Sequence, residues 1–225
     1  MLIVLEGLDG AGKSTQVNKL KDYLSKKTGR LEYLHFPRYD SDIYGDLISR
    51  FLRGEFGSND KVHPQLVALL FAEDRHSAVP QIRAYLAEGK TVLLDRYVYS
   101  NIAYQCAKSS SKEDAERLRK WILNTEFDAF GEPRPDLNIF LDVPIGFVER
   151  NLESNRVGSD RNYLSVERDI HEASIDFQKK VRDMYLRQAE EDPSLQVLEC
   201  SDADGKMLDK EIIFSKIRKL VDEVL

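Results

Sequence analysis

A short apolar run that stops abruptly at a glycine constrains this chain more than any other feature. Residues 2–5 (LIVL) predict a buried strand, and the run is followed by Gly7, four further residues, and then Gly12-Lys13-Ser14. Apolar residues recur after this point at the spacing of a helix, so that a strand precedes the glycines and a helix follows them. This spacing, in this setting, is the P-loop pattern.

The residue types in this stretch suit a phosphate group. Glycines let the backbone curl so that several N–H groups point inward, and the N-terminus of the following helix favours an anion. Lys13 adds a positive charge, and the hydroxyl of Ser14 can bind Mg²⁺. The alternative is a glycine-rich turn with an accidental lysine, which needs neither the strand nor the helix. The predicted phosphate-binding residues are Gly7, Leu8, Asp9, Gly10, Ala11, Gly12, Lys13, Ser14 and Thr15.

Composition limits the class of protein. With 225 residues, of which 42% are hydrophobic, the chain can bury a full core as a single domain spanning residues 1–225. Its net charge of −6 argues against general binding to nucleic-acid polymers or to a membrane surface, since both require a basic face. Anion binding is therefore expected to be local.

Cysteine usage and hydropathy predict a cytoplasmic protein. Cys106 and Cys200 are too few and too far apart for a disulfide framework or a metal site. No apolar run reaches the roughly 18 residues of a membrane span, and the N-terminus leads directly into a strand without a basic targeting region.

The rest of the chain alternates strands with helices. Further strands are predicted at residues 31–36, 91–95, 137–141 and 195–198, and helices at 13–27, 43–51, 64–87, 99–108, 112–125, 145–153, 166–191 and around 213–224. This alternation predicts a three-layer α/β/α fold whose five-stranded parallel sheet is covered on both faces. Residues 154–165 show little apolar periodicity and are interpreted as a mobile loop.

Polar residues follow the predicted strands. Asp95 ends the run TVLLD, as in a Walker B strand, and with Ser14 is the predicted Mg²⁺ ligand. Arg38 and Arg96 follow two strands, and ligands of open α/β sheets bind at the carboxyl ends of the strands. A lysine, Mg²⁺ and two arginines carry more positive charge than a nucleoside triphosphate alone requires. A second phosphate-bearing substrate, and hence phosphoryl transfer between nucleotides, is the favoured interpretation.

At this point the chain resembles the thymidylate kinases of the P-loop nucleoside-monophosphate kinase group, over nearly its whole length. The resemblance is carried by GLDGAGKST (7–15), FPR (36–38), LLFAEDR (69–75), DRYVYSNIAYQ (95–105) and an arginine-bearing loop that runs into RDIHE (168–172). It implies a P-loop NTPase fold with a mobile lid, conversion of dTMP and ATP to dTDP and ADP, and a homodimer.

The resemblance also assigns roles to single residues. It implies that Phe71 stacks on thymine, that Arg75, on the same helix face, donates to a base carbonyl, and that Asn101 pairs with the base edge. For Phe71 the alternative is a core aromatic, and for Asn101 an ordinary exposed helix residue. Tyr104 would lie against C2′ of the sugar, and Asp9 would accept a hydrogen bond from the 3′-hydroxyl.

Further residues are predicted around the acceptor phosphate and in the catalytic step. Arg38, next to Pro37 in the FPR motif, and Arg96 would clamp the acceptor phosphate, because the guanidinium fork suits that task. Surface ion pairs are the alternative for both arginines. The predicted substrate-binding set is Asp9, Pro37, Arg38, Phe71, Arg75, Arg96, Asn101 and Tyr104, and the predicted catalytic set is Lys13, Arg96, Arg150, Arg156 and Arg161.

The prediction of three lid arginines follows from a difference among thymidylate kinases in where the transition-state cation comes from. Some thymidylate kinases carry an arginine where this chain has Gly10, whereas others supply the transition-state cation from the lid. This chain resembles the second type, so Arg150, Arg156 and Arg161 are the candidates. At least one of them is expected to be an ordinary solvated arginine.

Two other functions stay open at this stage. A P-loop kinase for another acceptor, such as a deoxynucleoside or cytidylate, would be favoured if Phe71 and Arg75 were remote from the crevice. A GTPase switch or a regulatory nucleotide-binding module would need an Asn-Lys-x-Asp element. Residues 18–21 (NKLK) fail that pattern at the last position.

Overall fold

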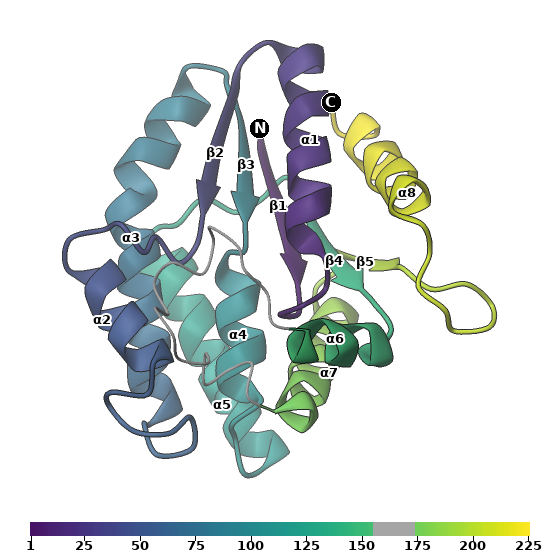
Figure 1. Cartoon of the computed structure of the whole chain (residues 1–225). Helices are drawn as coiled ribbons and strands as arrows, with labels where there is room; N and C mark the ends of the chain where they lie inside the picture. Colours follow the sequence, from purple (N-terminus) through teal and green to yellow (C-terminus); the bar gives the residue numbers. More distant parts are fainter. Residues whose placement is uncertain (155–173) are drawn as a thin grey trace.

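Five strands form one parallel sheet in the order β2-β3-β1-β4-β5 (Figure 1). The structure is a computed structural model that describes residues 1–154 and 174–225. The strands are β1 (Leu2–Gly7), β2 (Leu31–His35), β3 (Thr91–Asp95), β4 (Leu137–Asp142) and β5 (Leu195–Glu199). Every residue of β1 and β3 is buried, as expected for central strands covered on both faces.

Helices pack in two groups with the sheet between them. The helices are α1 (Lys13–Thr28), α2 (Tyr44–Leu52), α3 (Pro64–Ala87), α4 (Val98–Cys106), α5 (Lys112–Leu123), α6 (Ile145–Glu153), α7 (Ile175–Glu191) and α8 (Lys210–Asp222), with a π-helix η1 (Asn124–Ala129) after α5. Helix α1 packs on α8, whereas α4 packs on α3, α5 and α7 (Figure 1). The predicted three-layer fold with a five-stranded parallel sheet is confirmed.

Two helix predictions need correction. The sequence predicts one helix over 166–191, of which residues 166–173 lie outside the described residues. Ser174 has an extended backbone and its hydroxyl accepts a hydrogen bond from the N–H of Phe177, so that helix α7 begins at Ile175. The helix predicted over 112–125 changes to π geometry after Leu123. Hydrophobic periodicity detected neither event, because both are set by local backbone hydrogen bonds.

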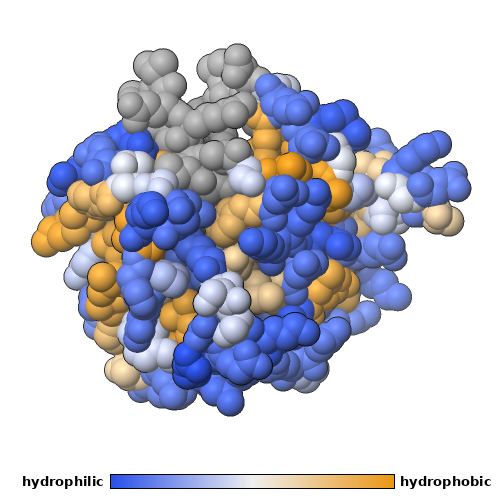
Figure 2. Space-filling model, turned by 90° about the horizontal axis from the view of Figure 1, so that it is seen from below, coloured by the Kyte–Doolittle hydropathy of each residue, from blue (hydrophilic) through white to orange (hydrophobic). Residues whose placement is uncertain are grey.

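The strand order places the candidate site. β1 lies between β3 and β4, and the residues that follow β1 and β3 therefore meet at one edge of the sheet. In Figure 1 the arrows of β1, β2 and β3 point downwards toward this edge. From below, the molecule shows a largely hydrophilic face with separate hydrophobic patches (Figure 2). Within the described residues, no helix combines the length and hydropathy needed to cross a bilayer.

Candidate active site

The loop after β1 curls back onto the N-terminus of α1. Gly10 and Gly12 have φ angles of 79° and 74°, a left-handed conformation that side chains disfavour. Gly12 is the N-cap of α1, and no side chain caps this helix end. No side chain therefore blocks this helix end against an anion, as the sequence predicts for residues 7–15.

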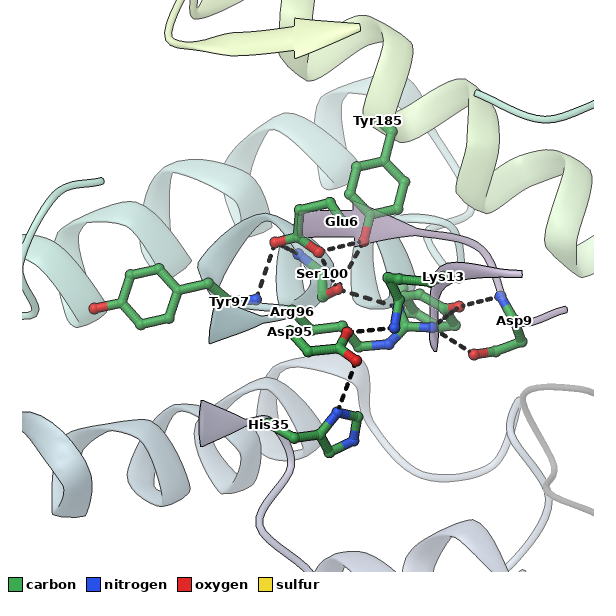
Figure 3. A network of polar contacts seen from close by, with 10 residues as sticks. Glu6, Asp9, Lys13, His35, Asp95, Arg96, Tyr97, Ser100 and Tyr185 are labelled. Atoms are coloured by element: carbon green, nitrogen blue, oxygen red, sulfur yellow. Dashed lines mark hydrogen bonds and ion pairs between the residues drawn. The ribbon is translucent and has the colours of Figure 1, made fainter. Parts of the chain in front are cut away.

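Lys13 and Asp95 form a buried ion pair at this point. The Lys13 ammonium contacts one oxygen of the Asp95 carboxylate, and Nδ1 of His35 lies 3.2 Å from the other (Figure 3). Burial opposes ionisation of Asp95, but the charge of Lys13 and the contact with His35 outweigh it and lower the pKa of Asp95 below its usual range. Parallel pairing sets His35 beside Asp95 on the neighbouring strand. His35 did not stand out in the sequence, because its position depends on strand register.

The donor set at this edge suits Mg²⁺. Among the described residues, there is no cluster of three or more histidine, cysteine, aspartate or glutamate side chains placed to bind a metal ion. Mg²⁺ bound with a nucleotide needs only one or two protein ligands, because phosphates and waters supply the rest. Ser14, exposed in the first turn of α1, and the Asp95 carboxylate offer the oxygen ligands that this ion prefers.

Arg96, directly after Asp95, joins the P-loop to α4. Its Nη2 atom lies 2.6 Å from a carboxylate oxygen of Asp9 and 3.3 Å from the Tyr104 hydroxyl, and its Nη1 atom lies 3.2 Å from the hydroxyl of Ser100. The N–H of Asp9 also donates to the Tyr104 hydroxyl at 3.1 Å. Three residues that the sequence assigns to the acceptor site are thus in direct contact.

Gln178, on α7, was missed by the sequence analysis. Its Nε2 atom donates to the carboxylate of Asp9 at 3.1 Å, and its Oε1 atom accepts from the N–H of Asp9 at 3.3 Å. The side chain is completely buried. Since Gln178 lies 169 positions from Asp9 in the chain, no local pattern could have paired them.

Glu6 anchors the N-terminus of α4. This buried carboxylate accepts hydrogen bonds from the backbone N–H groups of Tyr97 and Ser100, and from the hydroxyls of Ser100 and Tyr185 (Figure 3). The N-cap of α4, Tyr97, has no capping side chain of its own, so Glu6 supplies the cap from β1. Burial raises the pKa of Glu6, although the hydrogen bond from Ser100 and the charge of Arg96 oppose that shift.

A pocket of about 520 Å³, counting its open mouth, lies beside these residues. It is lined by Asp9, Phe36, Pro37, Tyr39, Leu52, Phe71, Arg75, Arg96, Ser100, Asn101, Tyr104 and Gln105. Seven of the eight predicted substrate-binding residues are in this set. Phe71 and Arg75 are therefore not remote from the crevice, which removes the observation that would have favoured another acceptor. We call this cavity the acceptor pocket.

Several lining residues differ from expectation. Asn101 is 4% exposed, so its interpretation as an ordinary exposed helix residue is wrong. Phe36, Tyr39, Leu52, Ser100 and Gln105 were not predicted as site residues. Phe36, Ser100 and Gln105 lie within motifs that carry the resemblance, so the signal was present for them; Tyr39 and Leu52 are placed by the packing of α2 on α3.

Arg75 is more buried than its predicted role implies. It is 2% exposed and makes a bidentate ion pair with Glu126 of η1, with nitrogen–oxygen distances of 2.5 and 2.8 Å. Glu126 was not predicted, because an acidic residue in the polar stretch NTEFDAFGE is typical of a solvated surface.

Arg38 is the predicted residue that does not line the acceptor pocket. Its guanidinium binds the carboxylate and backbone oxygen of Asp74 on α3, at 3.1 and 2.7 Å, and contacts the hydroxyl of Ser77. It lines a neighbouring surface hollow together with Pro37, which also borders the acceptor pocket. Its role as a phosphate clamp stays a prediction.

A second cavity lies on the other side of the P-loop. It has a volume of about 680 Å³, counting its open mouth, and is lined largely by apolar residues. Gly12, Thr15, Phe147, Cys200 and Met207 are among the lining residues. No local sequence pattern predicts this cavity, since α1, α6 and the segment after β5 meet there only in the fold.

Arg150 is exposed near the end of α6. The adjacent Asn151 donates a hydrogen bond of 2.8 Å to the carbonyl of Gly10, so α6 is attached to the P-loop. Arg156 and Arg161, and most of the predicted lid, lie outside the described residues.

Comparison with known proteins agrees with this geometry. The family model of thymidylate kinase matches residues 5–212. The chain belongs to the thymidylate kinase family. A probable thymidylate kinase of Thermococcus kodakarensis is 31% identical over 100% of this chain and 98% of its own length, and human thymidylate kinase is 38% identical over 64% of this chain and 61% of its own. The structure of Candida albicans thymidylate kinase superimposes with a TM-score of 0.70 at 28% identity, covering 99% of this chain and 91% of that one.

Proposed function

We propose that this protein is a dTMP kinase, which transfers the γ-phosphoryl group of ATP to dTMP and releases dTDP and ADP. The observation that carries the proposal is the acceptor pocket, where Phe71 and Arg75 meet Asp9 and Arg96 directly beside the P-loop. An aromatic face and a buried donor suit a pyrimidine base, and Arg96 suits its 5′-phosphate.

The donor nucleotide binds at the P-loop. Backbone N–H groups of the P-loop at the start of α1 hold the phosphates, and Lys13 exchanges its contact with Asp95 for one with the donor. Ser14 and Asp95 would hold Mg²⁺, which offsets phosphate charge when bound. The apolar cavity beside Gly12 has the position and character expected of the site for the adenine ring.

The acceptor is oriented by residues of α3, of α4 and of the loops that follow β1, β2 and β3. Phe71 stacks on the base, Arg75 and Asn101 bind the base edge, and Tyr104 excludes a 2′-hydroxyl. Asp9 accepts from the 3′-hydroxyl, while Arg96 and Arg38 serve the phosphate. Since Arg96 and Tyr104 are already held by Asp9 without substrate, these groups are preorganised for binding.

Transfer is an in-line displacement. A phosphate oxygen of dTMP attacks the γ-phosphorus of ATP, the new P–O bond forms, and the bond from this phosphorus to the β–γ bridging oxygen breaks, leaving ADP. The negative charge on the transferring phosphoryl group is stabilised by Lys13 and Arg96. One further arginine, among Arg150, Arg156 and Arg161, also stabilises it.

We also propose a cytoplasmic homodimer. Burial of both free cysteines supports a reducing compartment. An exposed face of α3 supports dimerisation: Leu66 is 66% exposed, and Leu69, three residues later on the same face, is partly exposed. Sedimentation equilibrium of the parent chain and of Leu66→Glu tests this assignment, and a parent that stays monomeric would contradict it.

An assay of ADP release, coupled to NADH oxidation, tests the activity. Purified protein receives ATP, Mg²⁺ and one of dTMP, dUMP, UMP, dCMP, CMP, dGMP or dAMP. We expect dTMP to give the highest kcat/KM. A higher value for a cytidine nucleotide would mean that the protein is a kinase for a different acceptor, and turnover that is independent of every monophosphate would indicate hydrolysis.

A further inference from the structure

A carboxylate outside the acceptor pocket binds two side chains that line it. Oε1 of Glu126 accepts hydrogen bonds of 2.8 Å from both Nη2 of Arg75 and Nδ2 of Asn101, and Oε2 accepts one of 2.5 Å from Nε of Arg75. Glu126 is fully buried and does not line the pocket itself. Any effect of Glu126 on a substrate must therefore pass through Arg75 and Asn101.

The first consequence concerns the amide of Asn101. Its Nδ2 atom donates to Glu126 and also, at 2.9 Å, to the backbone carbonyl of Ala68. Both partners are acceptors, so only the NH₂ end of the amide can face them. Its Oδ1 atom is buried and has no hydrogen-bond partner among the described residues. A buried carbonyl oxygen in this state favours a ligand that donates a hydrogen bond.

The second consequence concerns Arg75. Its Nε–H and one N–H of Nη2 are bound to Glu126, which leaves the other N–H of Nη2 and those of Nη1 as donors for a ligand. The carboxylate also offsets the guanidinium charge, so that Arg75 acts at the pocket as an oriented hydrogen-bond donor rather than as an unpaired cation.

Asn101 thus offers a hydrogen-bond acceptor and Arg75 a donor. The edge of uracil and thymine is complementary to this pair, because it carries N3–H next to the C4 carbonyl. Cytosine reverses this pattern, with a bare N3 atom next to a C4 amino group. We infer that Glu126 is a specificity-determining positioning residue, which selects uracil-type over cytosine bases by fixing the Asn101 amide and the Arg75 fork. This inference rests on the proposed kinase activity and deepens it.

The π-helix η1 positions the carboxylate of Glu126. Helix α5 ends at Leu123 and continues as η1, where hydrogen bonds span five residues rather than four. Glu126 and Phe127 are the buried residues of this turn. Single π turns inside helices occur frequently at functional sites, and here the turn brings an acidic side chain against α3 and α4.

The test compares dUMP with dCMP, which differ only at N3 and C4. In Glu126→Gln one carboxylate oxygen becomes an NH₂ group, so Arg75 and Asn101 can no longer all donate to this side chain, and their orientation toward the base is no longer fixed. We expect the ratio of kcat/KM for dUMP to that for dCMP to fall at least about tenfold, with little change in the KM for ATP. The ratio does not depend on the fraction of folded enzyme, so a purely structural defect would leave it unchanged.

Glu132→Gln is the matched control. Glu132 is also buried, with Oε2 3.8 Å from Nε of Arg75, but it makes no hydrogen bond to Asn101. Burial and the charge of Glu126 raise the pKa of Glu132 well above its usual range, in spite of the opposing charge of Arg75. Glutamine is close in shape to a carboxyl group that holds a proton, and the ratio should stay within about threefold of the parent.

An unchanged ratio in Glu126→Gln, or an equal fall in both variants, would overturn the inference. If Glu126→Gln is insoluble, Glu126→Asp replaces it: its carboxylate is one methylene shorter and cannot hold both partners, so the same fall is expected and an unchanged ratio overturns the inference again. Failure of the parent to phosphorylate dTMP would instead refute the proposed function.

Discussion

The ammonium of Lys13 contacts the carboxylate of Asp95, a residue 82 positions further along the chain. One residue begins α1 and the other ends β3, and their side chains meet because β1 and β3 are adjacent parallel strands. Both side chains are more than nine-tenths buried. Each of them is therefore the other's main charged partner while no nucleotide is bound.

Replacing Lys13 by methionine should nearly abolish turnover, because the donor phosphates and the transferring group lose their cation. Breaking a buried pair costs about 3 kcal/mol, and the variant should still fold, since domains have roughly 5–15 kcal/mol of stability. Steady-state kinetics and far-ultraviolet circular dichroism check the two statements. Substantial residual turnover with an unchanged spectrum would contradict the assignment of the P-loop.

The same variant should change the dependence of stability on pH. In the parent, the pKa of Asp95 is lower in the native state than in the unfolded chain, where it is about 3.9. The stabilisation is therefore complete above about pH 4 and is lost as the pH falls through the native value. Urea unfolding should show a smaller difference between parent and Lys13→Met at pH 3 than at pH 7. A difference that does not vary with pH would argue against the ion pair as its source.

The sugar should be selected at Tyr104. UMP differs from dUMP only by the 2′-hydroxyl, and forcing that group against a buried ring costs about 1–3 kcal/mol. We expect kcat/KM for UMP to be about 10- to 100-fold below that for dUMP. Because a lost methyl group is worth about 1 kcal/mol, dUMP should stay within about tenfold of dTMP. Equal rates for UMP and dUMP would exclude Tyr104 as the filter.

One lid arginine should supply the transition-state cation. Single alanine variants of Arg150, Arg156 and Arg161 should bind dTMP almost as the parent does, and at least one should lose about 100-fold or more in kcat. Arg156 is the first choice, since Arg150 belongs to α6 and Arg161 has Asp160 beside it. If all three variants turn over within about threefold of the parent, Lys13 and Arg96 carry this charge unaided.

Glu6 should stabilise the fold by capping α4. Glu6→Ala leaves two buried backbone N–H groups without an acceptor and should lower the free energy of unfolding by about 3 kcal/mol. Glu6→Gln retains one acceptor oxygen, and the hydroxyls of Ser100 and Tyr185 can rotate to accept from its amide, so the loss should be about 1 kcal/mol. Chemical denaturation of both variants measures the difference, and equal losses would mean that packing rather than capping is involved.

The sequence alone was sufficient for the strands and for the residues at their ends. Residues 2–5 and 91–95 are apolar runs ended by chemically distinctive residues, and both patterns were detectable locally. Asp9, Phe71, Arg96 and Tyr104 could be placed in one crevice because they belong to recognisable motifs. Their convergence follows from the strand order.

The buried polar residues that hold the site residues in place could not be predicted from the sequence, for a physical reason. Glu6, Glu126 and Gln178 are polar side chains that normally indicate solvent, and each is buried only because a partner far along the chain satisfies it. Such pairing depends on tertiary structure and leaves no periodic signal. Ser174 is different: serine followed by a helical pattern is a recognisable N-cap, so the start of α7 was detectable in the sequence.

Arg96 has a φ angle of 66°, the one positive value at a non-glycine residue among the described positions. Its N–H is bound to the carbonyl of Leu5, and the α4 turn that follows is capped by Glu6, so the surrounding fold maintains this conformation. A left-handed residue of this kind costs roughly 1–2 kcal/mol. Because the strain is already present before any substrate binds, it belongs to the free energy of folding. The activation barrier of phosphoryl transfer therefore does not include it.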